Sequence, residues 1–174
     1  MSEVYFISDT HFGHRGIISF EQCKPFRPFQ TIEEHDEHLV ECWNKTVRPK
    51  DVVFHLGDFC FGLRNLPIAG RLNGSKRLVM GNHDMYAADE YLKYFDRLFG
   101  VVEYKGMVLS HMPVHVNQLK RFYMNVHGHL HTNLVLKEDG TRDFRYFNAS
   151  VEHHKLTPIP LDEIYSYWAE NQSS

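Results

Sequence analysis

Short apolar runs alternate along the chain with segments in which apolar residues recur at helical spacing. Residues 3–8 alternate between apolar and polar positions and then become apolar, which predicts a buried strand that delivers Asp9. Residues 52–56 predict a second buried strand in the same way. Between the two, residues 32–44 place apolar side chains at helical intervals behind a capping-box sequence, so we expect an amphipathic helix there.

The rest of the chain predicts further strands, two of them pairs joined by tight turns. We expect strands at residues 77–80 and 124–126, hairpins at 101–110 and 133–147, and helices at 63–72, 91–99 and 161–168. Because helices and strands alternate early and hairpins follow late, a purely parallel sheet is not expected. The pattern predicts an α/β (α+β) fold of two packed mixed sheets with helices outside, in one domain spanning residues 1–174.

Composition narrows the class of protein. The chain has 174 residues, of which 43% are hydrophobic and 24% charged, as in a globular domain. No signal-peptide pattern and no membrane-length apolar run occurs, so the expected compartment is the cytoplasm, with no membrane partner. The net charge of −3 gives no sign of a strongly basic nucleic-acid surface, and we expect Arg27, His35 and His38 to be solvated. The three cysteines lack CxxC spacing and are expected to be reduced thiols.

Candidate metal ligands follow the predicted strands in five short clusters. These are Asp9-x-His11, Gly57-Asp58, Gly81-Asn82-His83-Asp84, Ser110-His111 and Gly128-His129-x-His131. Sites in open α/β sheets form at the carboxyl ends of strands, where we place all five clusters. Together they offer more oxygen and nitrogen ligands than one divalent ion uses, which predicts two metal ions and phosphoester chemistry.

The residue types also suggest distinct chemical roles. Asp58, behind the flexible Gly57, is the natural carboxylate to bridge two ions. A water shared by the ions would become a hydroxide nucleophile at neutral pH. His83 is not needed as a ligand and can protonate the departing alkoxide as a general acid, with Asp84 orienting its imidazole.

The ordered series of clusters resembles the calcineurin-like metallophosphoesterase superfamily over residues 4–151. The resemblance implies a four-layer αββα sandwich of two mixed sheets flanked by helices. It implies that Asp9, His11, Asp58 and His131 hold one metal, and that Asp58, Asn82, His111 and His129 hold the other. It identifies His83 as the acid. Residues 8–14 also resemble those of a small bacterial and phage subgroup of phosphoesterases.

Four further residues are candidates for supporting roles. His14 and Arg15 lie just past His11 in a glycine-containing loop and are candidates for substrate contact. His55 precedes Gly57-Asp58 within an apolar run, and it is either a hydrogen-bonded core residue or a partner that supports a metal ligand. His127 is expected to support its own loop.

Several functions share such a metal site. We expect a phosphodiesterase, acting on a cyclic nucleotide, another small phosphoester or a nucleic-acid end, because the chain has no cap domain to enclose a small monoester. The alternatives are a phosphomonoesterase or pyrophosphohydrolase on a small nucleotide, and a non-catalytic scaffold of the same fold. The expected cofactors are two divalent transition-metal ions, Mn first, with Fe, Zn or Ni accepted by the same ligands. Tight duplex binding is not expected, and the oligomeric state stays open.

Overall fold

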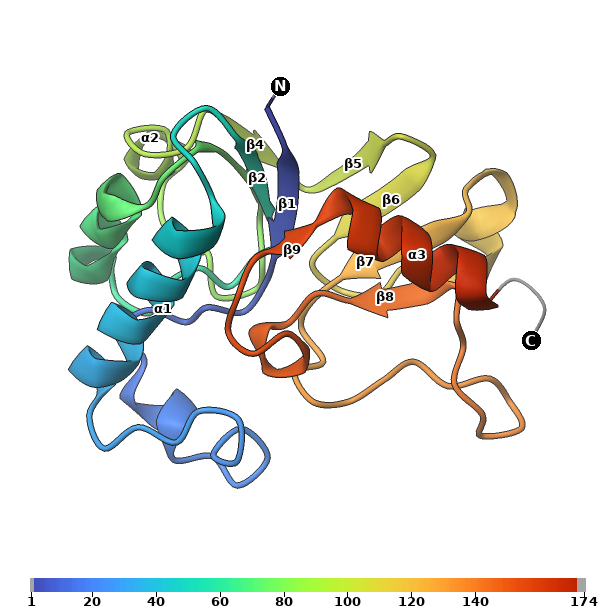
Figure 1. The fold of residues 1–174 in the computed structure, drawn as a ribbon, viewed down its shortest axis with the longest axis horizontal. Helices are drawn as coiled ribbons and strands as arrows, with labels where there is room; N and C mark the ends of the chain where they lie inside the picture. Colours follow the sequence, from blue (N-terminus) through green and yellow to red (C-terminus); the bar gives the residue numbers. More distant parts are fainter. Residues whose placement is uncertain (1, 172–174) are drawn as a thin grey trace.

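Two β-sheets pack face to face in the computed structural model, which describes residues 2–171 (Figure 1). The first sheet has the order β4-β3-β2-β1-β9 and the second β5-β6-β7-β8. The strands are β1 (Val4–Ile7), β2 (Val52–His55), β3 (Ser75–Val79), β4 (Arg97–Phe99), β5 (Val101–Tyr104), β6 (Met107–Ser110), β7 (Met124–His127), β8 (Tyr146–Asn148) and β9 (Ile159–Pro160). Each sheet is mixed, because β9 runs antiparallel to β1 and β5 runs antiparallel to β6.

Helices surround the two sheets. They are η1 (Arg15–Ile18), α1 (Ile32–Thr46), η2 (Leu63–Arg71), α2 (Ala88–Tyr91), η3 (Val116–Arg121), η4 (Val151–His153) and α3 (Leu161–Asn171), with the η elements being 3-10 helices. The predicted capping box is present, since the Glu34 amide donates to the Thr31 hydroxyl at 3.1 Å. No helix within residues 2–171 has both the length and the apolar character needed to cross a membrane.

Side chains on β1 and β2 point alternately to the two faces of the first sheet, which divides the core in two. Phe6 and Phe54, paired in register, face the second sheet and meet Leu109 and Phe147 there. The opposite faces of β1 and β2 meet the α1 side chains, including the fully buried Trp43. Leu119 of η3 covers the outer face of the second sheet, and α3 packs beside β9 with Tyr167 against Phe147. This arrangement confirms the predicted αββα sandwich.

Two predicted elements are wrong. The helix predicted at residues 91–99 stops at Tyr91, and Arg97–Phe99 forms the edge strand β4, paired with β3. Apolar residues at this spacing suit either element, and pairing with β3 decides the outcome. The hairpin predicted at 133–147 is reduced to one bridge, and its second half becomes β8, parallel to β7.

Candidate metal centre

The five clusters lie together where strands of both sheets end. In Figure 1, β7 and β8 point toward the end of β1. Main-chain hydrogen bonds join the loops directly: the Asp9 amide donates to Gly57 O at 3.0 Å, and the His11 amide to Asp58 O at 3.0 Å. The Gly128 amide donates to His111 O at 2.9 Å. Main-chain hydrogen bonds therefore connect the loops at the strand ends, where the sequence placed the clusters.

The backbone at this rim adopts an uncommon conformation. Five residues of the predicted ligand set have positive φ: Asp9 (59°), His11 (50°), Asp58 (55°), His129 (68°) and His131 (49°). Left-handed conformations cost residues other than glycine about 1–2 kcal/mol each. Asp and His tolerate them better than most residues, and such outliers gather at functional sites.

The ligand atoms form two groups that meet at Asp58. One group comprises Asp9, His11 and His131, the other Asp58, His111 and His129, and within each the atoms lie within 4.8 Å of one another. Asp58 Oδ2 is 3.6 Å from His11 Nε2 and 3.4 Å from His111 Nε2, so it lies between the groups. Asn82 Oδ1 is 2.9 Å from His111 Nε2 and belongs with the second group.

Unpartnered buried atoms show that the residues of the first group fit a metal ion. Asp9 Oδ2 accepts hydrogen bonds from the His129 amide at 2.9 Å and from Ser150 Oγ at 2.8 Å. Asp9 Oδ1 and His11 Nε2, by contrast, are buried and have no partner within residues 2–171. Burial raises the pKa of Asp9 and holds the pKa of His11 well below its usual value, so that His11 is neutral. Such atoms are costly unless they bind something, and neutral imidazole with carboxylate suits a divalent transition metal.

Glycine allows the loops to approach this closely. A Cβ atom at Gly128 would overlap the side chains of Ser8 and Asp9. Gly57 has a φ of +97°, and a Cβ atom there would overlap the His111 ring. The glycines of the motifs therefore let the ligand loops pack against one another.

A buried ion pair that the sequence did not reveal supports the first ligand group. Glu152 Oε1 lies 3.0 Å from His131 Nδ1, which leaves His131 Nε2 facing Asp9. Arg27 donates to the same Glu152 oxygen at 2.7 and 2.9 Å, and to the carbonyls of Asp9 at 2.6 Å and Thr10 at 3.1 Å. Although burial favours the neutral acid, His131 and Arg27 lower the pKa of Glu152 to about 2.

The expectation that Arg27 and His35 are solvated is therefore wrong. Both are fully buried, and His35 Nε2 lies 2.9 Å from Arg27 Nη1. His35 shares the buried face of α1 with Leu39, one turn later. Its Nδ1 lies 2.9 Å from Asp36 Oδ1, and Asp36 also accepts the Gly13 amide at 2.8 Å. His38, in contrast, is partly exposed.

Replacing Arg27 by Met is expected to lower the free energy of unfolding by about 3–5 kcal/mol, because the buried Glu152 charge loses its arginine partner. Urea unfolding of metal-free protein measures this change. The matched control is Arg71→Met, which removes an exposed pair with Glu37 and should cost no more than about 1 kcal/mol. Equal losses of unfolding free energy in the two variants would show that the buried pair stabilises the protein no more than the exposed pair does.

The general-acid candidate, His83, lies beside the ligand groups. The His83 ring is partly exposed, with its centroid 5.6 Å from that of His11. The His83 amide donates to Asp58 Oδ1 at 2.9 Å, which ties its loop to the proposed bridging carboxylate. The structure thus brings His83 to the metal ligands without making it one of the two groups.

The role predicted for Asp84 needs correction. Its carboxylate accepts hydrogen bonds from the amides of Asp58 at 2.8 Å, Phe59 at 3.0 Å and Gly81 at 2.8 Å, so it does not orient the His83 imidazole. Buried at 5% exposure, this carboxylate is satisfied by backbone donors. Asp84 therefore fixes the two loops that carry Asp58 and Asn82.

His55 and His127 lie behind the ligands. The Gly57 amide donates to His55 Nδ1 at 3.2 Å, so His55 Nε2 carries the proton and donates to Thr10 Oγ1 at 2.9 Å. His55 thus joins two ligand loops, and burial lowers its pKa to about 3. His127 Nδ1 lies 2.8 Å from Gly128 O, within its own loop, and burial lowers its pKa to about 4.

Buried neutral histidines predict loss of stability in mild acid. Burial lowers the pKa of His154, away from the ligands, to about 4, whereas an unfolded histidine has a pKa near 6.5. Below pH ~6.5 the unfolded chain therefore binds the extra proton, and stability falls by up to ~1.4 kcal/mol per pH unit for such a group. Urea unfolding in chelator at pH 7, 6 and 5 should give His154→Gln a shallower decline than wild type. Identical declines would contradict the assignment.

The two substrate-contact candidates differ in environment. His14 is half-buried and stacks on Phe61 with ring centroids 4.4 Å apart, while Phe20 meets it edge-on at 5.7 Å. Arg15 begins η1 and is exposed. The structure thus places His14, but not Arg15, in an aromatic cluster beside His11.

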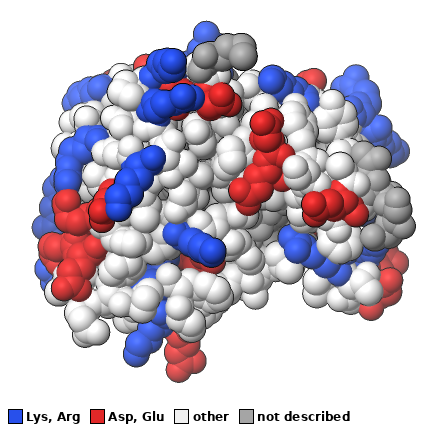
Figure 2. All heavy atoms as spheres, viewed as in Figure 1, with Lys and Arg blue, Asp and Glu red and all other residues white. Residues whose placement is uncertain are grey.

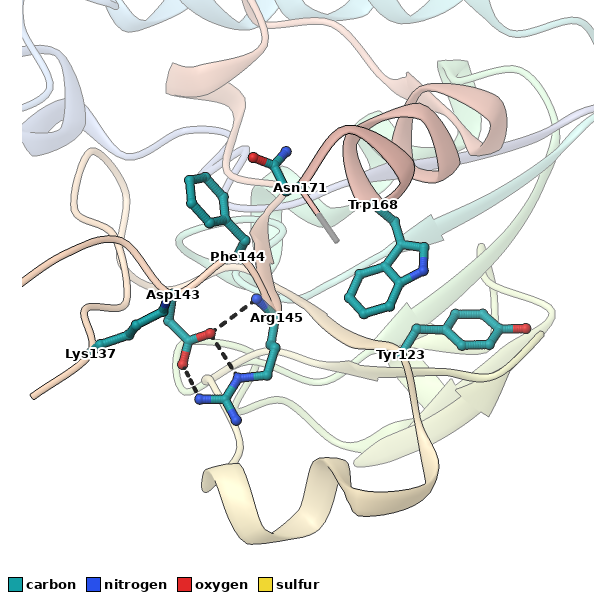
Figure 3. A pocket seen from close by; sticks show the side chains of 7 residues that line it. All are labelled: Tyr123, Lys137, Asp143, Phe144, Arg145, Trp168 and Asn171. Carbon is teal, nitrogen blue, oxygen red and sulfur yellow. Dashed lines mark hydrogen bonds and ion pairs between the residues drawn. The ribbon is translucent and has the colours of Figure 1, made fainter. Parts of the chain in front are cut away.

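A separate cavity of about 670 Å³ lies beside α3 (Figure 3). Trp168 and Tyr123 line one side of it, and Arg145 forms an ion pair with Asp143 at 2.6 Å on the other. None of the predicted metal ligands lines this cavity. The candidate centre lies instead where the ligand loops meet.

Comparison with known proteins agrees with the motifs. The family model described as calcineurin-like phosphoesterase matches residues 2–173. An uncharacterized protein of Methanocaldococcus jannaschii is 35% identical, over 94% of this chain and 90% of that protein. The gene 66 protein of Mycobacterium phage L5 is 34% identical over 89 residues, 48% of this chain and 41% of that protein. The crystal structure of an Aquifex aeolicus protein of unknown function is similar with a TM-score of 0.70 and 29% identity, over 95% of this chain and 99% of that one.

Proposed function

This chain belongs to the calcineurin-like phosphoesterase family, and from that premise we propose that it is a two-metal phosphodiesterase. The observation that carries the proposal is the position of Asp58 Oδ2, 3.6 Å from His11 Nε2 and 3.4 Å from His111 Nε2. A carboxylate between two groups of imidazole nitrogen and carboxylate oxygen ligands suits a pair of divalent cations.

The proposed ligand assignment follows the two groups. Asp9, His11 and His131 would hold one ion, Asn82, His111 and His129 the other, and Asp58 both. When bound, the two cations neutralise charge on the phosphoester and lower the pKa of a water that attacks phosphorus. Mn²⁺ is the ion we expect, and Fe, Zn or Ni suit the same ligands.

His83 is the proposed proton donor. It follows the ligand Asn82, its ring lies near that of His11, and its partial exposure leaves it open to an arriving substrate. Protonation of the leaving oxygen by His83 prevents a free alkoxide from forming. The hydrogen bond from its amide to Asp58 Oδ1 keeps the donor aligned with the proposed bridge.

The openness of the site favours a diester. Asn82 is exposed and His83 is only partly buried, so both substituents of a diester have room. A phosphomonoesterase or pyrophosphohydrolase would use the same ligands and is the alternative. On the face shown in Figure 2, Lys and Arg are interspersed with Asp and Glu, which favours a nucleotide or a strand end over a duplex. A non-catalytic scaffold would have no need of His83.

Chelation tests the proposal. Protein treated with EDTA should lose hydrolysis of bis(p-nitrophenyl) phosphate, and added Mn²⁺ should restore it, because the ligands act only through bound ions. Elemental analysis should find two ions per restored chain. Activity that persists in metal-free protein would refute the proposal, and faster hydrolysis of p-nitrophenyl phosphate than of the diester would favour the alternative.

A further inference from the structure

Exposed aromatic rings lie on the His83 side of the proposed metal centre. Phe61 is 45% exposed and Phe20 is 47% exposed. The Phe61 ring centroid lies 6.0 Å from that of His83, and the His14 ring lies between Phe61 and Phe20. We refer to Phe20, His14 and Phe61 as the aromatic shelf.

The shelf is held in a fixed position relative to the metal ligands. The Phe61 amide donates to Phe12 O at 2.8 Å, and Asn65 Nδ2 donates to Phe61 O at 2.5 Å. The His14 amide donates to the carbonyl of the ligand His11 at 3.0 Å. Because these bonds order the backbone that carries the rings before any ligand arrives, stacking on the rings carries a small entropic cost.

The shelf has a partially free surface. The planes of Phe61 and His14 are only 17° apart, so His14 covers one face of Phe61. Phe61 is still 45% exposed despite this stacking, so part of its ring is free. A planar ligand can extend this stack next to the proposed proton donor.

We propose that the aromatic shelf binds the base of a nucleotide whose phosphoester lies at the metal centre. The inference rests on the proposed function, since it supplies the second anchor of the same substrate. In a nucleotide the phosphoester is joined through a sugar to a planar base, so the phosphoester can lie at the metal centre while the base lies on the shelf. Every base has a π-face that stacks on an aromatic side chain. The net charge of −3 fits a single nucleotide or strand end, which needs few cationic contacts.

Equilibrium binding separates the base from the phosphate. Protein loaded with Mn²⁺ is titrated calorimetrically with AMP and with ribose 5-phosphate, which share the sugar phosphate and differ in the base. We expect AMP to bind about 10–100-fold more tightly, the range that stacking of one base provides. Phe61→Ala should remove most of this ratio and leave ribose 5-phosphate binding unchanged, whereas Phe61→Tyr should preserve the ratio.

Phe26→Ala is the matched control. Phe26 is 46% exposed but is not part of the shelf, so its loss should leave the ratio at the wild-type value. Equal affinities of the wild-type protein for the two ligands, or equal weakening of both by Phe61→Ala, would overturn the shelf alone. Wild-type protein that binds no Mn²⁺ would overturn the proposed function and the shelf together.

Discussion

Asp58→Asn is expected to reduce turnover of a phosphodiester by at least ~10³-fold and to lower the occupancy of both metal sites. Each 1.36 kcal/mol of lost transition-state stabilisation costs a factor of ten, and metal ions contribute several kcal/mol. Asp58 Oδ2 lies between the two ligand groups, so neutralising it weakens both. Asparagine keeps the size of the side chain and an oxygen to accept the His83 amide.

The measurement is metal content after dialysis, together with kcat on bis(p-nitrophenyl) phosphate. Asp96→Asn is the matched control, because the exposed Asp96 carboxylate accepts a hydrogen bond from Ser75 Oγ and lies outside both ligand groups. That control should retain two ions and full turnover. Two ions in the Asp58 variant at wild-type affinity would disprove the bridge.

On a substrate with an alkoxide leaving group, His83→Ala is expected to slow turnover by about 10²–10⁴-fold, the usual contribution of a general acid. Both ions should stay bound. The loss should depend on the leaving group. A nitrophenoxide departs readily without a proton, whereas an alkoxide needs one. Bis(p-nitrophenyl) phosphate should therefore be affected much less than a dinucleotide.

Comparison of kcat for the two substrates, with metal analysis of the same samples, checks this prediction. Equal losses on both substrates would assign His83 to positioning rather than to proton transfer. Loss of an ion in the variant would instead make His83 a ligand or a support for one, contrary to its place outside the two ligand groups.

The sequence reveals the candidate ligands because their placement depends on local information. An apolar run such as Val4–Ile7 defines a strand, and the residue that follows it must lie at the carboxyl end. Repeating this reasoning at β2 and β7 brings Asp58 and His129 to the same rim. This prediction can be made without knowing which strands are neighbours in a sheet.

The missed features all depend on contacts between distant segments. Arg27 and Glu152 are 125 residues apart, and no local pattern distinguishes a buried arginine from a solvated one. His35 is similar, since its buried ring contacts Arg27, which lies outside its helix. The strand Arg97–Phe99 likewise exists because β3 is available to pair with it.

The left-handed backbone at the metal centre has an evolutionary consequence. Asp9, Asp58 and His131 each hold a conformation that glycine or asparagine would adopt at lower cost, so selection for stability alone would replace them. A lineage that keeps this fold but abandons catalysis should therefore drift at the ligand loops before it drifts in the core. If the proposed function holds, the intact series in this chain reflects selection for metal binding that outweighs the stability it forgoes.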